Sequence, residues 1–135
     1  MLRFVQMAQG SRRRSHGFTL IELLVVLAIV AVMLTLAVPR YLQHVERSKQ
    51  AVLRENLKVT REVIDRYYGD KGRYPDSLQE LVDQRYLRGL PFDPLTESAD
   101  TWLLVPPPKG LSGQVYDLHS AAQGQGDDGR AFGDW

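Results

Sequence analysis

A predominantly apolar run of 21 residues, from Phe18 to Val38, constrains this chain more than any other feature. As a helix rising 1.5 Å per residue, the run would be roughly 31 Å long, about the thickness of the hydrocarbon core of a bilayer. A core helix of a soluble protein is usually shorter and carries polar residues on one side. We therefore expect residues 18–38 to form a single membrane-spanning helix. The only polar residues in the run are Thr19, Glu22 and Thr35.

The segment before the run is basic. The chain as a whole is nearly neutral, with 17 basic and 16 acidic residues, so it offers no general positive field for nucleic acid. Residues 1–17 nevertheless hold four arginines and no acidic residue. A positive flank predicts a cytoplasmic N-terminus. A secretory signal peptide matches less well. The apolar region of a signal peptide is shorter than this run and is followed by a cleavage site of small residues.

The chain after the apolar run continues with helical periodicity. Pro39 should bend the helix rather than end it, since proline removes one backbone hydrogen bond. Gly69 is the predicted end of the helix. One side of this amphipathic segment is predicted to be apolar and buried. Its residues are Leu42, Val45, Val52, Leu53, Leu57, Thr60, Val63, Ile64 and Tyr67.

The remaining residues predict a short helix and a small sheet. Ser77 is followed three residues later by a glutamate, which matches a capping box and predicts a helix from about residue 78 to 87. Residues 101–105 and 114–120 are the strand candidates. We expect a hairpin, or a three-stranded sheet with one short partner, to pack on the amphipathic helix. The fold class predicted from these elements is α+β.

Glu22 is costly in an apolar helix and points to processing of the chain. A charged side chain costs on the order of 2.5–3.5 kcal/mol at the bilayer centre, and less near the helix end. No lysine or arginine lies between Arg14 and Arg40 to pair with it. Cleavage between Gly17 and Phe18 would create a free amine one helical turn away. The residues therefore favour cleavage after Gly17, with Glu22 paired to its own amine or to a neighbouring copy's.

At this point the sequence resembles a known family. The motif Gly17-Phe18-Thr19-Leu20-Ile21-Glu22, with its basic flank and apolar span, resembles the class III leader of type IV pilins and pseudopilins. The resemblance implies that residues 1–17 are a prepilin leader peptide and that a prepilin peptidase cuts after Gly17. It also implies that Phe18 is N-methylated and that Glu22 acts in assembly. Pro39 stands where this family commonly has a proline.

Further segments resemble the major pseudopilin of type II secretion systems. The resemblance implies a type IV pilin-like α+β fold, with a long transmembrane and amphipathic helix packed on a short helix and a small antiparallel sheet. Residues 39–135 would then be the periplasmic globular domain. The segments that carry it are Val38-Pro39-Arg40-Tyr41, Glu46-Arg47, Gly72-Arg73-Tyr74-Pro75, Asp93-Pro94 and Tyr116-Asp117-Leu118-His119-Ser120.

The function implied is structural, and no residue pattern indicates an enzyme. The resemblance implies a subunit that polymerises through its N-terminal helix into a pseudopilus and helps export folded proteins. It implies a single-pass protein of the bacterial inner membrane with its C-terminal domain in the periplasm. The implied partners are further copies, other pseudopilins, prepilin peptidase and the inner-membrane secretion platform. Two alternatives stay open: a type IV pilin or competence pseudopilin for adhesion, motility or DNA uptake, and a membrane-anchored binding domain that never polymerises.

The resemblance also raises calcium as the one candidate cofactor. Major pseudopilins of this kind carry a C-terminal calcium-binding loop, but here the early aspartate of that loop is missing from Ser120–Gly124. Calcium takes six to eight oxygen ligands, which include carboxylates and backbone carbonyls. The alternative is a solvated acidic tail that Phe132 and Trp135 anchor. The candidate metal ligands are Asp117, Asp127 and Asp128.

Overall fold

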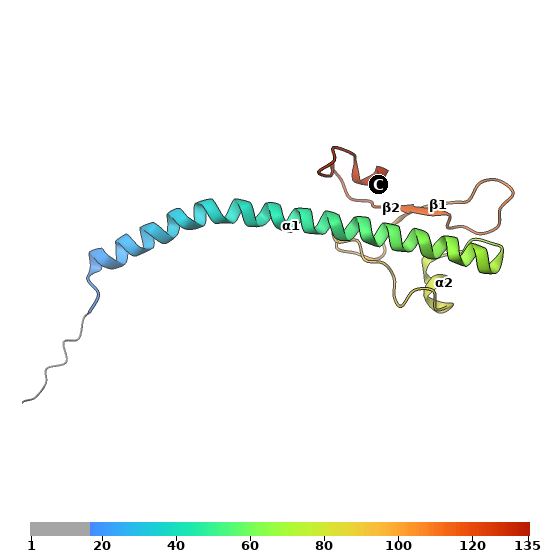
Figure 1. Ribbon diagram of the computed structural model, residues 1–135, viewed down its shortest axis with the longest axis horizontal. Coiled ribbons are helices and arrows are strands. Elements are labelled where there is room, and N and C mark those ends of the chain that lie inside the picture. Colours follow the sequence, from blue (N-terminus) through green and yellow to red (C-terminus); the bar gives the residue numbers. More distant parts are fainter. Residues whose placement is uncertain (1–16) are drawn as a thin grey trace, which may run out of the picture. The chain divides into compact units, whose positions relative to one another are not determined.

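The computed structural model of the protein describes residues 17–135, and the predicted leader up to residue 16 lies outside the described residues. The elements follow the order α1, α2, β1, β2 and a final 3-10 helix, η1 (Figure 1). The chain divides into two compact units at the boundary between Pro39 and Arg40. The helices and strands have the bounds α1 Leu20–Lys71, α2 Leu78–Asp83, β1 Leu103–Val105, β2 Asp117–His119 and η1 Phe132–Asp134.

The described part of the first unit is the N-terminal part of α1 with the three residues before it. The helix begins at Leu20 rather than at Phe18, because the Thr19 hydroxyl accepts a hydrogen bond from the Glu22 backbone N–H at 3.2 Å and caps the first turn. Each residue from 17 to 38 is exposed. Among the described residues, α1 is the one helix long and apolar enough to cross a membrane. The prediction of a membrane-length helix is confirmed by length and composition.

In the second unit, α1 buries one face against the rest of the chain. The buried residues recur every three or four positions, as a helix face requires, and each buried large apolar side chain contributes about 1.5–3 kcal/mol. The predicted face is only partly confirmed: Leu42 and Val52 are exposed, because the buried core of this unit gathers along α1 only from Leu53 onward. The buried α1 residues are Leu53, Leu57, Thr60, Val63, Ile64 and Tyr67.

The C-terminus of α1 lies two residues beyond the predicted stop. Gly69 is helical, and Lys71 is the last helical residue. Gly72 follows with a φ of 71°, and its N–H donates to the Tyr68 carbonyl at 2.8 Å. A left-handed glycine just after the last turn is a common way for helices to end. The prediction of Gly69 was wrong because two glycines lie close together and Gly72 takes the left-handed conformation.

The short helix α2 has the predicted start but ends earlier. The Ser77 hydroxyl accepts from the Glu80 backbone N–H at 3.1 Å, which confirms the predicted cap. The helix ends at Asp83 rather than at residue 87, because Arg85 adopts a left-handed φ of 62°. The chain turns there, and the N–H of Tyr86 donates back to the Leu81 carbonyl at 2.8 Å.

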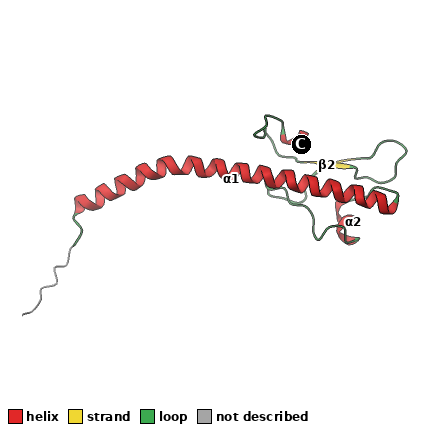
Figure 2. Cartoon of the chain, viewed as in Figure 1, coloured by secondary structure: helices red, strands yellow, loops and turns green. Residues whose placement is uncertain are grey.

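The strands form a small antiparallel hairpin, as predicted, although each is shorter than its candidate segment, 101–105 or 114–120. β1 pairs with β2 so that Leu103 lies opposite His119 and Val105 opposite Asp117. Within residues 17–135 the sheet has these two strands, without the third strand that the sequence left open. In Figure 1, α2 lies below the C-terminal half of α1 and the hairpin above it. Loops make up most of the chain after α1, as Figure 2 shows.

Candidate functional site

The predicted cleavage site lies immediately before α1. The Gly17–Phe18 bond belongs to residues 17–19, which have no regular structure, and the Phe18 side chain is 81% exposed. Peptidases cut most readily where the backbone is exposed and free of helical hydrogen bonds. The local structure therefore suits cleavage at this bond.

Glu22 lies in the first turn of α1, three residues after Thr19. This spacing is that of a capping box, and the Thr19 hydroxyl makes the expected bond to the Glu22 backbone N–H, although no cap was predicted here from the sequence. A carboxylate in the first helical turn is also favoured by the helix dipole. The Glu22 side chain forms no ion pair within residues 17–135. Its carboxylate is thus available to a cation outside the described part of the chain.

The three aspartates proposed as metal ligands are paired with arginines of α1. Arg61 Nε lies 2.6 Å from an Asp117 carboxylate oxygen. Arg54 Nη2 lies 2.5 Å from Asp127 and 3.5 Å from Asp128. Among the described residues, no three His, Cys, Asp or Glu side chains gather as a metal site. The carboxylates that calcium would need are engaged by guanidinium groups, so the residues as arranged do not fit calcium.

The arginine contacts tie together residues distant in the sequence. Arg61 Nη2 donates to the main-chain oxygens of Leu118 at 2.9 Å and Trp135 at 2.6 Å. The Arg54 guanidinium also lies over the Trp135 ring, 4.1 Å from its centroid, as a cation–π contact. Hydrogen bonding to Arg54 lowers the pKa of the Asp127 carboxyl, and the same bond raises the pKa of Arg54.

Neither arginine was among the residues predicted from the sequence. Arg54 and Arg61 are seven residues apart, which places them two turns apart on one side of α1, beside the buried Leu57. The sequence does contain a signal for these contacts. Two arginines seven residues apart flank an apolar helix face, and the chain ends in an acidic segment with which they could pair.

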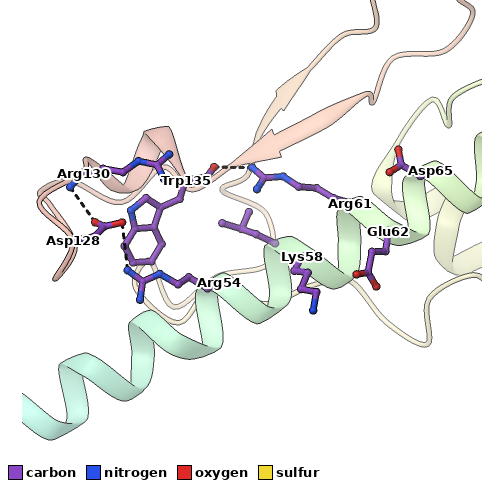
Figure 3. Close-up of a pocket in the computed structure, with 9 residues that line it drawn as sticks. Arg54, Lys58, Arg61, Glu62, Asp65, Asp128, Arg130 and Trp135 are labelled. Carbon is purple, nitrogen blue, oxygen red and sulfur yellow. Dashed lines mark hydrogen bonds and ion pairs between the residues drawn. The ribbon is translucent and has the colours of Figure 1, made fainter.

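A cleft of about 390 Å³ lies beside these arginines (Figure 3). Its walls carry both signs of charge, and Figure 3 shows Arg54 and Arg61 reaching from α1 towards the C-terminal segment. Most of its lining residues are charged, so its chemistry is that of ion pairing. The lining residues are Arg54, Leu57, Lys58, Arg61, Glu62, Asp65, Asp128, Arg130 and Trp135.

Two further carboxylates hold the second unit together. Glu80 accepts hydrogen bonds from Arg73 at 2.5 Å, the Tyr67 hydroxyl at 2.7 Å and the Asp76 backbone N–H at 2.7 Å. These bonds, with Arg73 the strongest cause, lower the pKa of Glu80 to about 2. Asp93 is fully buried and accepts from the Ser120 hydroxyl at 2.5 Å. The latter contact joins two of the segments on which the family resemblance rests.

Comparisons with known proteins place a known sequence motif at the N-terminal part of the chain. The model of the prokaryotic N-terminal methylation motif matches residues 12–38. This range includes the predicted cleavage bond, Glu22 and the exposed part of α1 up to Val38. No solved structure matches the chain significantly.

Similar proteins extend the match to most of the chain. The type II secretion system core protein G of Klebsiella pneumoniae is 30% identical over 139 residues, which cover 91% of this chain and 96% of that protein. Its counterpart from Pseudomonas aeruginosa is 29% identical over 92% of this chain and 97% of that protein. The type IV major pilin protein PilA of Myxococcus xanthus is 37% identical, but over 50% of this chain and 31% of that pilin. The chain belongs to the family of type II secretion system core protein G, and it is a pseudopilin subunit of α+β, type IV pilin-like fold.

Proposed function

We propose that this chain is a structural subunit of a type II secretion pseudopilus. A prepilin peptidase cuts it after Gly17 and methylates Phe18, and the mature chain polymerises through the N-terminal part of α1. The subunit is held in the bacterial inner membrane with residues 39–135 in the periplasm. Its partners are further copies, other pseudopilins and the inner-membrane secretion platform. The observation that carries this proposal is the exposed apolar part of α1, in which no side chain from residue 20 to 38 is buried.

This apolar surface needs a cover. Continuous apolar surface of this extent is unstable in water and marks a membrane or protein interaction site. A lipid bilayer covers it in the monomer, since the helix is long enough to span the hydrocarbon core. In a filament, the apolar helices of neighbouring copies take the place of lipid. The same surface thus serves first as an anchor and then as the assembly interface.

Glu22 has two separable roles in this proposal. Its backbone N–H bonds to the capping residue Thr19, and its first-turn carboxylate favours the start of the helix. Its carboxylate also has no ion pair within the described residues, so it pairs with the Phe18 amine of a neighbouring copy and sets the register of the incoming subunit. Inside a filament the Glu22 carboxylate would be surrounded by apolar helices. A carboxylate buried there without its cation is costly, so loss of the pair should block assembly.

The test compares Glu22→Gln, Glu22→Val and Thr19→Ala in cells with an active prepilin peptidase. Glutamine keeps the shape of glutamate but removes the charge, whereas Thr19→Ala removes the cap and leaves the charge. We expect all three variants to be inserted and cleaved, which mass spectrometry of the N-terminus checks. Both Glu22 variants should fail to form filaments or support secretion, and Thr19→Ala should retain both. Normal filaments from Glu22→Gln would reject the charge-pairing role.

A second candidate is a type IV pilin or competence pseudopilin for adhesion, motility or DNA uptake, which the PilA match favours. Deletion of the coding sequence separates the two. Loss of secreted proteins with unchanged surface pili supports the secretion pseudopilus. Loss of pili, twitching or DNA uptake with normal secretion supports the pilin. A membrane-anchored binding domain would leave both intact and keep the uncleaved N-terminus.

A further inference from the structure

The C-terminal segment, residues 120–135, has little regular structure of its own. Its backbone contributes the three-residue helix η1 and an isolated bridge between Gln125 and Ala131. Its buried residues at the end of the chain are Phe132 and Trp135, whose rings meet edge to face at 5.1 Å between centroids. Besides this apolar packing, side chains of α1 contact the segment through hydrogen bonds and ion pairs.

Those contacts come from two arginines at two points. Arg54 pairs with Asp127 and Asp128 and covers the Trp135 ring. Arg61, two turns further along, donates to the main-chain oxygen of Trp135 and also pairs with Asp117 of β2, just before the segment. Gln50 adds a neutral contact, since its side-chain oxygen accepts from the Asp127 N–H at 2.9 Å. The arginines therefore contact the segment at Asp127 and Asp128 and again at Trp135.

The arginines use the oxygens that a calcium ion would need. One oxygen of each of the Asp127 and Asp117 carboxylates lies within 2.6 Å of a guanidinium nitrogen, so a calcium ion could not take both oxygens of either carboxylate without displacing an arginine. One Asp128 oxygen is also used locally, because it accepts from the Arg130 backbone N–H at 3.0 Å. Like charges on neighbouring aspartates repel one another, and a guanidinium between them removes that repulsion as a cation would.

We propose that the C-terminal segment is fastened to α1 by Arg54 and Arg61 in place of a bound calcium ion. The segment is therefore ordered by ion pairs within the chain, and its order is independent of calcium. This inference does not depend on polymerisation, because the contacts all lie within the second unit of one chain. It predicts that high salt loosens the segment, since half-exposed ion pairs are screened by salt.

Trypsin gives a direct test on the full chain in detergent micelles. Arg130 lies inside the segment and becomes a better substrate when the segment opens. Lys109 lies in an exposed turn before β2 and serves as an internal reference. The measured quantity is the ratio of cleavage after Arg130 to cleavage after Lys109. The ratio cancels any effect of calcium on trypsin itself.

We expect the wild-type ratio to be equal in millimolar calcium and in EGTA. Arg54→Gln should raise the ratio about tenfold, because it opens the segment locally without unfolding the core. Asp127→Asn should act in the same direction, and the double variant should add little to Arg54→Gln, since both remove the same contact. Lys58→Gln is the matched control: it removes a positive charge from the same cleft, and Lys58 forms no ion pair among the described residues.

Two results would overturn the proposal. One is a wild-type ratio that falls in calcium and rises in EGTA, which would show that calcium orders the segment. The other is an Arg54→Gln ratio equal to that of Lys58→Gln, which would show that the arginine contact does not hold it. The wild-type comparison needs no variant, so the proposal remains testable even if Arg54→Gln does not fold.

Discussion

The two halves of α1 have similar helical geometry and opposite surroundings. From residue 20 to 38 the helix exposes each apolar side chain, whereas from Leu53 to Tyr67 it buries one face and exposes the other. The first half is apolar all round, and the second is amphipathic. A helix that is apolar all round must be covered on all sides, by lipid or by other helices, whereas an amphipathic helix needs one covered face. The difference indicates that the second half belongs to the fold of the single chain and the first half to its assembly.

Isoleucines of the two halves provide the sharpest comparison and the largest expected effect. Ile64 is fully buried and Ile29 is 53% exposed. Ile64→Ala should lower the free energy of unfolding of the second unit by about 2–5 kcal/mol, because it removes buried contacts and leaves a cavity. Ile29→Ala should leave that free energy unchanged. Chemical denaturation of the full chain in detergent, followed by the fluorescence of the tryptophans, measures both. Equal losses would contradict the division of α1 into two functions.

The second prediction concerns Glu80, whose three hydrogen-bond donors all belong to the second unit. Its pKa is lowered from 4.5 to about 2, so its stabilisation is present above pH 4.5 and is lost as the pH falls towards 2. The loss should be on the order of 2–3 kcal/mol, since the folded state prefers the charged form. Denaturation curves between pH 6 and 2 should show this loss in the wild type. Glu80→Gln should be less stable at neutral pH and should lack this part of the pH dependence; a variant with unchanged pH dependence would reject the role of Glu80.

The third prediction compares the caps of the two helices. Ser77→Ala should destabilise the second unit by about 1 kcal/mol, because the Glu80 backbone N–H loses its acceptor. Thr19→Ala removes the equivalent contact at the start of α1, but this start is exposed and packs on no core. It should therefore leave the stability of the second unit unchanged. Thermal unfolding of the two variants side by side checks this. A similar change in melting temperature for both variants would count against the independence of the two halves of α1.

Local patterns gave most of the fold. The long helix, the Ser77 cap and the β1–β2 pairing follow from apolar spacing, capping residues and β-branched or aromatic runs, which act over a few residues. The errors at Gly69 and at the end of α2 have a local cause as well, since Gly72 and Arg85 take left-handed conformations that the pattern left ambiguous.

The arginine contacts could not be predicted in this way. Arg54 and Asp127 are 73 residues apart, and Arg61 and Asp117 are 56 residues apart, so no local pattern connects them. The family resemblance made the aspartates candidate calcium ligands, with a solvated acidic tail as the alternative, and neither interpretation included an arginine partner. In the structure α1 passes beside the C-terminal segment and carries the arginines there, which is the basis of the proposal that they take the place of calcium. At the N-terminus, by contrast, the cleavage bond, the cap and Glu22 lie within six consecutive residues, which is why the motif could be recognised directly.

The N-terminal mass of the protein extracted from membranes tests the central claim most directly. If the first half of α1 is the assembly helix of a processed pseudopilin, the mature chain must begin with N-methylated Phe18, with Glu22 in its first helical turn. We predict this N-terminus in cells with an active prepilin peptidase, and the uncleaved chain in cells without the peptidase. A chain that keeps Met1 while the peptidase is active would contradict the account.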